Sequence, residues 1–249
     1  METVVGASTS PYWEDAQRRR RAVAAAFDRH AGQRATWKRR AAHYHSTLGE
    51  LCRRYVSPQS RVMELGCNTG DLLASLEPTL GVGLDISRRS LAIARARYPH
   101  LHFVEGDAQA IPFDVPWDAI ILADTLGYVD DVWQTLRSAH AAATPDTRVI
   151  IISHNFVWRP ALAFAENVGL KMPVGLENWL GTPDIENLLC LTHFDVVERG
   201  QAMLSPVRLP LLGTWMEEAA DWSPLRHLAL VLYWVLRPRP RPQQRPLSC

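Results

Sequence analysis

The stretch VMELGCNTGDLL, Val62 to Leu73, joins an apolar strand, a glycine-punctuated turn and the start of a helix. Gly66 and Gly70 stand where the chain must turn tightly and where a ligand can approach bare backbone. Asn68, between them, is the kind of non-glycine residue that most readily enters the left-handed region. The free N–H groups at the start of the helix attract an anionic or electron-rich group. With Glu64 just before the turn, the stretch predicts a nucleotide-cradling loop, although a purely structural turn uses glycines too.

Two later segments also end a predicted strand in an acidic residue. LGVGLDIS, residues 80–87, ends in Asp85, about 20 positions beyond the loop, where a carboxylate can accept hydrogen bonds from two ribose hydroxyls. LHFVEGDAQAIPF, residues 101–113, carries Asp107 followed by Ala108. The carboxyl ends of parallel strands meet at one edge of an open α/β sheet. The acids are therefore expected to face one crevice, although each alone is more typical of a solvated loop.

Taken in order, the motifs ELGCNTG, GLDIS, EGDAQ and AIILADTLGYVDD resemble the class I S-adenosylmethionine-dependent methyltransferases across residues 44–197. This resemblance implies an α/β fold, a Rossmann-like seven-stranded and mostly parallel sheet with N-terminal helices and a helical cap insertion. A dinucleotide-binding loop reads G-x-G-x-x-G, whereas this loop reads G-x-N-x-G, so hydride transfer is the weaker interpretation.

The resemblance also implies S-adenosylmethionine as cofactor and suggests where it binds. By position, the loop lies against the methionine part, Asp85 holds the ribose hydroxyls, Asp107 and Ala108 lie at the adenine, and Ile86 packs on the adenine face. Asn68 occupies the place of the middle glycine of the family's loop. The implied cofactor-binding residues are Tyr44, Glu64, Gly66, Cys67, Asn68, Gly70, Asp85, Ile86, Asp107, Ala108 and Asp124.

Candidate catalytic residues follow the fourth and fifth predicted strands. Methyl transfer from a sulfonium is an in-line displacement, so a protein contributes chiefly positioning and sometimes a base. His154 is the best candidate base because imidazole titrates near neutrality, the alternative being a histidine that only caps a strand. Asp124 is expected to accept a proton, orient the acceptor or hold the cofactor's amino group, and Tyr128 is a third candidate. Asp124 with Asn155 also suggests a divalent cation, but no second carboxylate is clearly placed, so no metal site is predicted.

An aromatic-bearing helix, Trp37 to His45, precedes the first predicted strand. In the resembled family such a helix often closes over the cofactor, and Tyr44 is placed to do so. Packing of Trp37 and Tyr44 between helix and sheet is an equally good interpretation. His43 and His45 flank Tyr44 and cannot share a helix face, so they are not a metal pair.

Composition narrows the class of protein. The chain has 249 residues, a formal net charge of +1 and 47% hydrophobic residues, which allows a full core and argues against a nucleic-acid binder. Basic runs at 18–21, at 34–40 and after Arg237 are interpreted as solvated helix faces and a tail rather than an RNA or membrane patch. Four cysteines without metal-ligand spacing indicate free thiols in a reducing compartment. Without a signal peptide or a long apolar run, the sequence predicts a cytoplasmic protein with no stable membrane insertion.

Periodicity gives the expected organisation. Helices fill residues 14–55 with a break at Gly32; strands are expected near 61–66, 80–85, 101–105, 117–123 and 147–153, with helices between them. Such alternation forces a parallel sheet with right-handed crossovers. A helix capped by Thr182 and strands at 194–203 and 230–238, the last pair antiparallel, complete the sheet. The predicted parts are a helical segment at 1–57, a methyltransferase domain at 58–236 with cap elements at 156–180 and 204–230, and a disordered Arg–Pro tail at 237–249.

The two cap elements decide the expected acceptor. They are apolar for connections, with aromatic residues at Trp158, Phe164, Trp179, Trp215 and Trp222. They form either a small helical core of their own or the walls of a pocket for a hydrophobic acceptor. Because the charged runs are expected outside the crevice, the sequence predicts methyl transfer to oxygen, nitrogen or carbon of a small, hydrophobic biosynthetic metabolite. The alternative is a protein of this fold that binds the cofactor without methyl transfer, such as a cyclase or a regulatory partner. The oligomeric state stays open.

Overall fold

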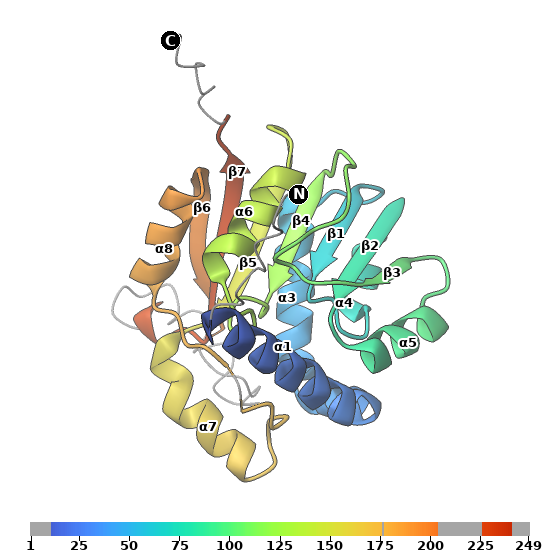
Figure 1. Cartoon of the computed structure of the whole chain (residues 1–249), viewed down its shortest axis with the longest axis vertical. Helices are drawn as coiled ribbons and strands as arrows, with labels where there is room; N and C mark the ends of the chain where they lie inside the picture. Colours follow the sequence, from blue (N-terminus) through green and yellow to red (C-terminus); the bar gives the residue numbers. More distant parts are fainter. Residues whose placement is uncertain (1–10, 176, 204–225, 241–249) are drawn as a thin grey trace, which may run out of the picture.

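A single seven-stranded sheet with the order β3-β2-β1-β4-β5-β7-β6 forms the centre of the computed structural model, which describes residues 11–175, 177–203 and 226–240 (Figure 1). The strands are β1 (Arg61–Leu65), β2 (Leu80–Asp85), β3 (His102–Glu105), β4 (Ala119–Ala123), β5 (Arg148–His154), β6 (Phe194–Ala202) and β7 (Val231–Pro238). The first five run parallel, while β7 is antiparallel to both β5 and β6. The predicted Rossmann-like, mostly parallel sheet with a last antiparallel pair is confirmed.

Helices precede the sheet and alternate with its strands. The helices are α1 (Pro11–His30), α2 (Arg34–Arg40), α3 (Ala42–Tyr55), α4 (Asp71–Ser75), α5 (Arg88–Arg97), α6 (Val132–Ala142), α7 (Arg159–Asn167) and α8 (Thr182–Leu191), with 3-10 turns η1 (Ala31–Gln33), η2 (Phe156–Trp158) and η3 (Arg226–Leu228). The break expected at Gly32 is the turn η1. Helix α8 begins at Thr182 as predicted, but its cap is Gly181, whose N–H donates to the Asp184 carboxylate at 2.9 Å.

The core is two-sided because successive residues of the central strands point to opposite faces. Val62, Ile121 and Ile150 pack with residues of α3, α4 and α5 on one face. Met63 and Ile120 pack with residues of α6 and α8 on the other. A strand covered on both faces is apolar at every position, which is why the segments AIILA and RVIIIS are nearly unbroken hydrophobic runs.

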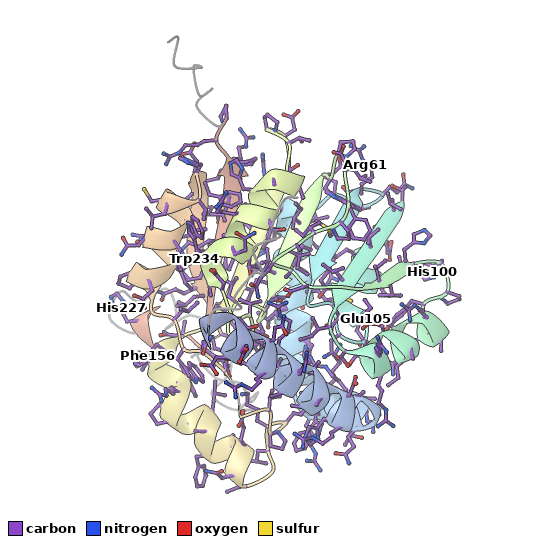
Figure 2. The ribbon with its side chains drawn as sticks, in the orientation of Figure 1. Arg61, His100, Glu105, Phe156, His227 and Trp234 are labelled. Atoms are coloured by element: carbon purple, nitrogen blue, oxygen red, sulfur yellow. The ribbon has the colours of Figure 1, made fainter. Side chains whose placement is uncertain are left out.

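The carboxyl ends of the parallel strands meet at one end of the sheet. Arg61, which begins β1, lies at the upper end in Figure 2, whereas Glu105, the last residue of β3, and Phe156, just after β5, lie toward the lower end. Helices α1 and α7 lie at this lower end (Figure 1). The N-terminal helices therefore cover the edge where an open α/β sheet binds its ligands.

The predicted start of the disordered tail is wrong. Arg237 and Pro238 belong to β7, where they pair with Asp195 and Phe194 of β6. The N–H of Arg239 then donates to the His193 carbonyl at 2.8 Å. The pairing of β7 with β5 ends at Leu236, but its pairing with β6 continues to Pro238 and so extends the strand. Residues 241–249 lie outside the described part of the chain.

The predicted cap elements are described only in part. Residues 156–175 and 177–180 contain η2, α7 and irregular chain, and Trp158 donates its indole N–H to the Leu228 carbonyl at 2.7 Å. Of the element at 204–230, residues 204–225 lie outside the described part, and with them Trp215 and Trp222. Cys52, Cys67 and Cys190 are free thiols as predicted, and Cys249 falls outside the described residues. Among the helices that are described, none has the length and apolar character needed to cross a bilayer.

Candidate functional site

The loop between β1 and α4 contains three residues with left-handed backbone angles. The φ values are 75° at Gly66, 50° at Asn68 and 74° at Gly70, so the conformation expected for Asn68 is confirmed. A Cβ added at Gly66 would lie 2.6 Å from the Thr125 hydroxyl oxygen, and one at Gly70 would lie 2.5 Å from the Phe103 ring. Both glycines are therefore required by backbone angle and by space.

We expect Asn68→Val to destabilise the protein, because a β-branched residue is strained at a positive φ, whereas Asn68→Gly removes the strain. A non-glycine residue held in this region costs about 1–3 kcal/mol. Thermal unfolding of the two variants and the wild type measures the difference. Equal melting temperatures for the valine and glycine variants would show that this account of the loop is wrong.

Asp85, the last residue of β2, stabilises the backbone of the loop between β1 and α4. Its carboxylate accepts the N–H of Asn68 at 2.7 Å and the N–H of Ser87 at 2.8 Å, one on each oxygen. Burial raises the pKa of Asp85, and these two N–H groups oppose that rise. Each carboxylate oxygen still has lone pairs free. Asp85 can therefore accept further hydrogen bonds from a pair of neighbouring hydroxyls.

Glu64 ties β1 to the helix that follows the loop. Its carboxyl oxygen accepts the N–H of Leu73 at 3.0 Å. Burial raises the pKa of Glu64 to about 8, so the group is mostly protonated at neutral pH. Glu64 thus presents a neutral carboxyl group, able to donate as well as accept, beside the loop.

A cavity of about 1060 Å³ lies over the carboxyl ends of the strands. Typical small-molecule pockets span about 300–1,000 Å³, so this cavity has room for a cofactor and a second small molecule. The predicted residues that line it are Tyr44, Glu64, Gly66, Cys67, Asn68, Asp85, Ile86, Asp107, Ala108, Asp124, Tyr128 and His154. Gly70 is the exception: it is absent from the cavity wall and precedes α4, with its α-carbon facing Phe103.

Four polar side chains cluster in the cavity beyond the loop. The Tyr44 hydroxyl donates to Asp124 at 2.6 Å, and the Tyr44 ring stacks on His154 with centroids 5.4 Å apart. Nδ1 of His154 lies 3.4 Å from a Glu177 oxygen and 3.7 Å from an Asp124 oxygen. Tyr128 approaches the cluster through its hydroxyl, 3.4 Å from the second Glu177 oxygen. Tyr44 therefore packs in the core and also forms part of the polar site, while its closure over the cofactor stays a prediction.

The two carboxylates control the charge of His154. Burial lowers the pKa of His154, but Asp124 and Glu177 together outweigh burial and raise it above its ordinary value. Burial would likewise raise the pKa of Glu177, but His154 and Lys171 lower it, so Glu177 stays ionised. Lys171 lies 3.2 Å from Glu177 and 2.6 Å from Glu166. The result is a chain of alternating charges that leads from His154 to α7.

Glu177 and Lys171 were not predicted from the sequence. They lie in irregular chain between α7 and α8, where no periodicity places a side chain on one face. An isolated acid in such a segment normally faces solvent. Only the fold brings Glu177 beside His154.

The prediction that charge lies outside the crevice is wrong. Arg20 and Arg34, from the two basic runs, line the cavity, as do Lys38 and Arg40. The Arg20 guanidinium lies 2.6 Å from Asp107 and 3.2 Å from Asp130. The reason is topological, because α1 and α2 lie over a strand edge rich in acids whose burial requires opposite charge.

The structure does not bring Asn155 together with Asp124. The Asn155 amide donates to the carbonyls of His227 at 2.9 Å and Ala229 at 2.8 Å, and its oxygen accepts the N–H of Val157 at 3.2 Å. These bonds anchor the start of β7 against the end of β5. Within the described ranges, no group of three or more His, Cys, Asp and Glu side chains is arranged to hold a metal ion.

Buried acceptor atoms in the cavity wall show which chemistry it fits. Within the described residues, Oδ1 of Asn68 and Oδ1 of Asp124 are buried and have no hydrogen-bond partner. Buried polar atoms normally have one, so a ligand that supplies N–H and O–H donors suits these positions. Together with Asp85, they fit a nucleoside that carries an amino group.

Comparison with known proteins agrees with this geometry. Residues 62–146 match a family described as "Methyltransferase domain". The structure is similar to a solved S-adenosylmethionine-dependent methyltransferase of Thermotoga maritima, a possible histamine N-methyltransferase, with a TM-score of 0.69, 16% identity, and coverage of 87% of this chain and 100% of the other. Residues 62–146 are therefore similar in sequence to a methyltransferase domain, and the chain has the Rossmann-like fold of the class I methyltransferases.

Among curated proteins, the 2-phytyl-1,4-naphthoquinone methyltransferase of Thermosynechococcus vestitus is 35% identical over 109 residues, which are 40% of this chain and 48% of that protein. The chain spans about half the length of the curated relatives it matches. A solved [4+2]-cyclase, SpnF, shares the fold with a TM-score of 0.56, 15% identity, and coverage of 77% of this chain and 80% of the other. The same architecture therefore also occurs in a protein named for cyclisation.

Proposed function

We propose that this protein transfers a methyl group from S-adenosylmethionine to a small, hydrophobic, ring-bearing molecule. The observation that carries the proposal is the continuity of one cavity, from the glycine loop above Asp85 to the cluster of Tyr44, Asp124 and His154. The first part suits the nucleoside and amino-acid portions of the cofactor. The polar groups of the second part support an acceptor atom bound beside the methyl group.

In this proposal Asp85 would hold the ribose hydroxyls, and Gly66 and Asn68 would line the methionine portion. Ile86, Asp107 and Ala108 would line the adenine, with Asp107 also paired to Arg20. When bound, S-adenosylmethionine supplies a methyl group on a positively charged sulfur, ready for in-line displacement. The protein orients the acceptor and excludes water from the reacting atoms.

The acceptor would lie in an apolar compartment of the cavity, which we define as Phe27, Trp37, Tyr128, Met172 and Val174. Tyr128 meets Phe27 edge to face, with centroids 5.1 Å apart. Walls of this kind bury most of a ligand while a few polar groups orient it. The naphthoquinone in the name of the curated relative is a small, apolar ring molecule that such walls would suit. The proposal covers methyl transfer to an oxygen, nitrogen or carbon atom of the acceptor.

His154 is the proposed base for an acceptor O–H, N–H or acidified C–H. Its Nδ1 faces Glu177 and Asp124, which fixes the ring and stabilises the imidazolium after proton uptake. The Tyr44 ring, stacked on the imidazole and held by its hydrogen bond to Asp124, keeps the imidazole in that orientation.

The free thiols of Cys52, Cys67 and Cys190 support a cytoplasmic location, since reduced cysteines are typical there.

The test of the proposal measures binding and transfer separately. Calorimetry with S-adenosylhomocysteine asks whether the cavity holds the cofactor. Mass spectrometry then follows the formation of S-adenosylhomocysteine from S-adenosylmethionine with a 2-prenyl-1,4-naphthoquinol as acceptor. Binding without acceptor-dependent turnover would favour the alternative, a protein that uses the cofactor without methyl transfer, as the shared fold of a cyclase allows.

We expect Glu177→Gln to move the acidic limb of the kcat profile to lower pH. A base acts only when deprotonated, so kcat rises as the pH rises through the pKa of His154. Glu177 helps to raise that pKa, so removing its charge lowers the midpoint, while the wild-type midpoint lies above the ordinary histidine value of about 6.5. Profiles of kcat against pH for both proteins measure the shift. Glu50→Gln, an exposed change, is the control, and an unmoved midpoint in Glu177→Gln contradicts the role.

A further inference from the structure

Arg34, the first residue of α2, differs from the other basic side chains of the cavity. Arg20, Lys38 and Lys171 each form an ion pair with a carboxylate. Arg40 donates to the Gly169 carbonyl at 3.1 Å. Within the described residues, Arg34 has no carboxylate within ion-pair distance, and its Nε is buried without a hydrogen-bond partner.

The direct side-chain contact of Arg34 is with an apolar residue. Its Nη1 lies 3.8 Å from the sulfur of Met172, a residue of the apolar compartment defined above. Burial lowers the pKa of Arg34, and the charges of Asp85 and Asp124 offset this only in part. An uncompensated buried guanidinium is costly, and a bidentate carboxylate is the ligand that best matches its geometry.

Arg34 and Lys38 have different direct contacts in the cavity. Arg34 and Lys38 are four residues apart and so lie on the same face of α2, one turn from each other. Lys38 pairs with Asp71, the first residue of α4, and so takes the place beside the loop where the amino-acid end of the cofactor would lie. Arg34 contacts Met172 instead, on the side of the apolar compartment.

We infer that Arg34 binds a carboxylate of the acceptor, which would therefore be an amphipathic ring acid: an apolar body in the compartment, an acidic group on Arg34, and the reacting atom near His154. This inference rests on the proposed function, because it assigns the second ligand of the same cavity. The acceptor inferred here carries a carboxylate, unlike the neutral quinone in the name of the curated relative.

The test is a set of calorimetric titrations on the full chain saturated with S-adenosylhomocysteine. The probes are 1-hydroxy-2-naphthoate and 1-naphthol, which differ in the carboxylate alone. We expect the wild type to bind the acid about tenfold to a hundredfold more tightly than the naphthol, the range for a hydrogen bond to a charged group. Arg34→Met should remove this preference by weakening only the acid, and Arg34→Lys should keep part of it because the charge remains.

Arg39→Met is the matched control, because Arg39 is an exposed residue of the same helix. A second comparison uses S-adenosylhomocysteine and 5′-methylthioadenosine, which lacks the amino-acid carboxylate. If Arg34→Met weakens the first and spares the second, Arg34 holds the carboxylate of the cofactor and the inference is overturned. It is also overturned if the wild type binds both naphthalene probes equally or fails to bind the acid. Failure of both nucleosides to bind the wild type would instead refute the proposed function.

Discussion

His154→Ala is expected to lower kcat by about 10² to 10⁴-fold, the usual contribution of a general base, while the affinity for S-adenosylhomocysteine stays nearly unchanged. The reason is placement. His154 ends β5 at the strand edge that faces the cavity, with its ring held by Tyr44 on one side and by two carboxylates at Nδ1. Initial rates at saturating acceptor, together with calorimetry, separate the loss of turnover from any loss of binding.

The matched control is His100→Ala, which removes an exposed histidine in the turn before β3 (Figure 2) that is not part of the cavity lining. It should leave kcat unchanged. An acceptor that is already nucleophilic needs only positioning. Turnover close to wild type in His154→Ala, at every pH from about 6 to 9, would therefore remove the base and leave Tyr44, Asp124 and Tyr128 as orienting groups.

Asp85→Ala is expected to weaken the binding of S-adenosylhomocysteine by roughly tenfold to a hundredfold, because hydrogen bonds to a charged carboxylate contribute about 1.5–3 kcal/mol. The same change also leaves the N–H groups of Asn68 and Ser87 without their acceptor. Loop order is therefore lost together with the contact to the ribose.

Asp85→Asn divides the two effects in part, since the amide oxygen still accepts one of the two backbone N–H groups while the other N–H loses its acceptor and the charge is removed. Calorimetry gives the affinities, and thermal unfolding without ligand reports the stability of the loop. Asp146→Ala, at an exposed position outside the cavity, is the control. Unchanged affinity in a folded Asp85→Ala variant would exclude Asp85 from the ribose site.

The sheet and the glycine loop could be predicted because their signals are local. The strands β4 and β5 are nearly unbroken apolar runs, and the alternation of strands and helices fixes a parallel order. Gly66, Asn68 and Gly70 are residue types suited to positive φ, and all three have it. The acids at the strand ends lie at one edge of the sheet because the strands are parallel, and the alternation of strands and helices in the sequence predicts that order.

The predictions that were wrong or missing concern residues whose contacts come from segments far apart in the sequence. The basic residues of α1 and α2 read as solvated because nothing local shows that these helices cover an acidic edge, yet Arg20 pairs with Asp107. Glu177 reaches His154 only through the path of irregular chain between α7 and α8. Arg237 and Pro238 join β7 because their pairing with Asp195 and Phe194 of β6 outweighs their poor strand propensity.

The central claim, methyl transfer within this cavity, is tested most directly with S-adenosylmethionine that carries a deuterated methyl group. The acceptors are 2-prenyl-1,4-naphthoquinol, 1-hydroxy-2-naphthoate and 1-aminonaphthalene, which offer carbon, oxygen and nitrogen, and mass spectrometry follows the label. We predict a labelled product from at least one acceptor, formed in equal amount with S-adenosylhomocysteine and strongly reduced in Asp85→Ala. Tight binding of S-adenosylhomocysteine with no label in any acceptor, and no turnover above that without acceptor, would contradict the claim.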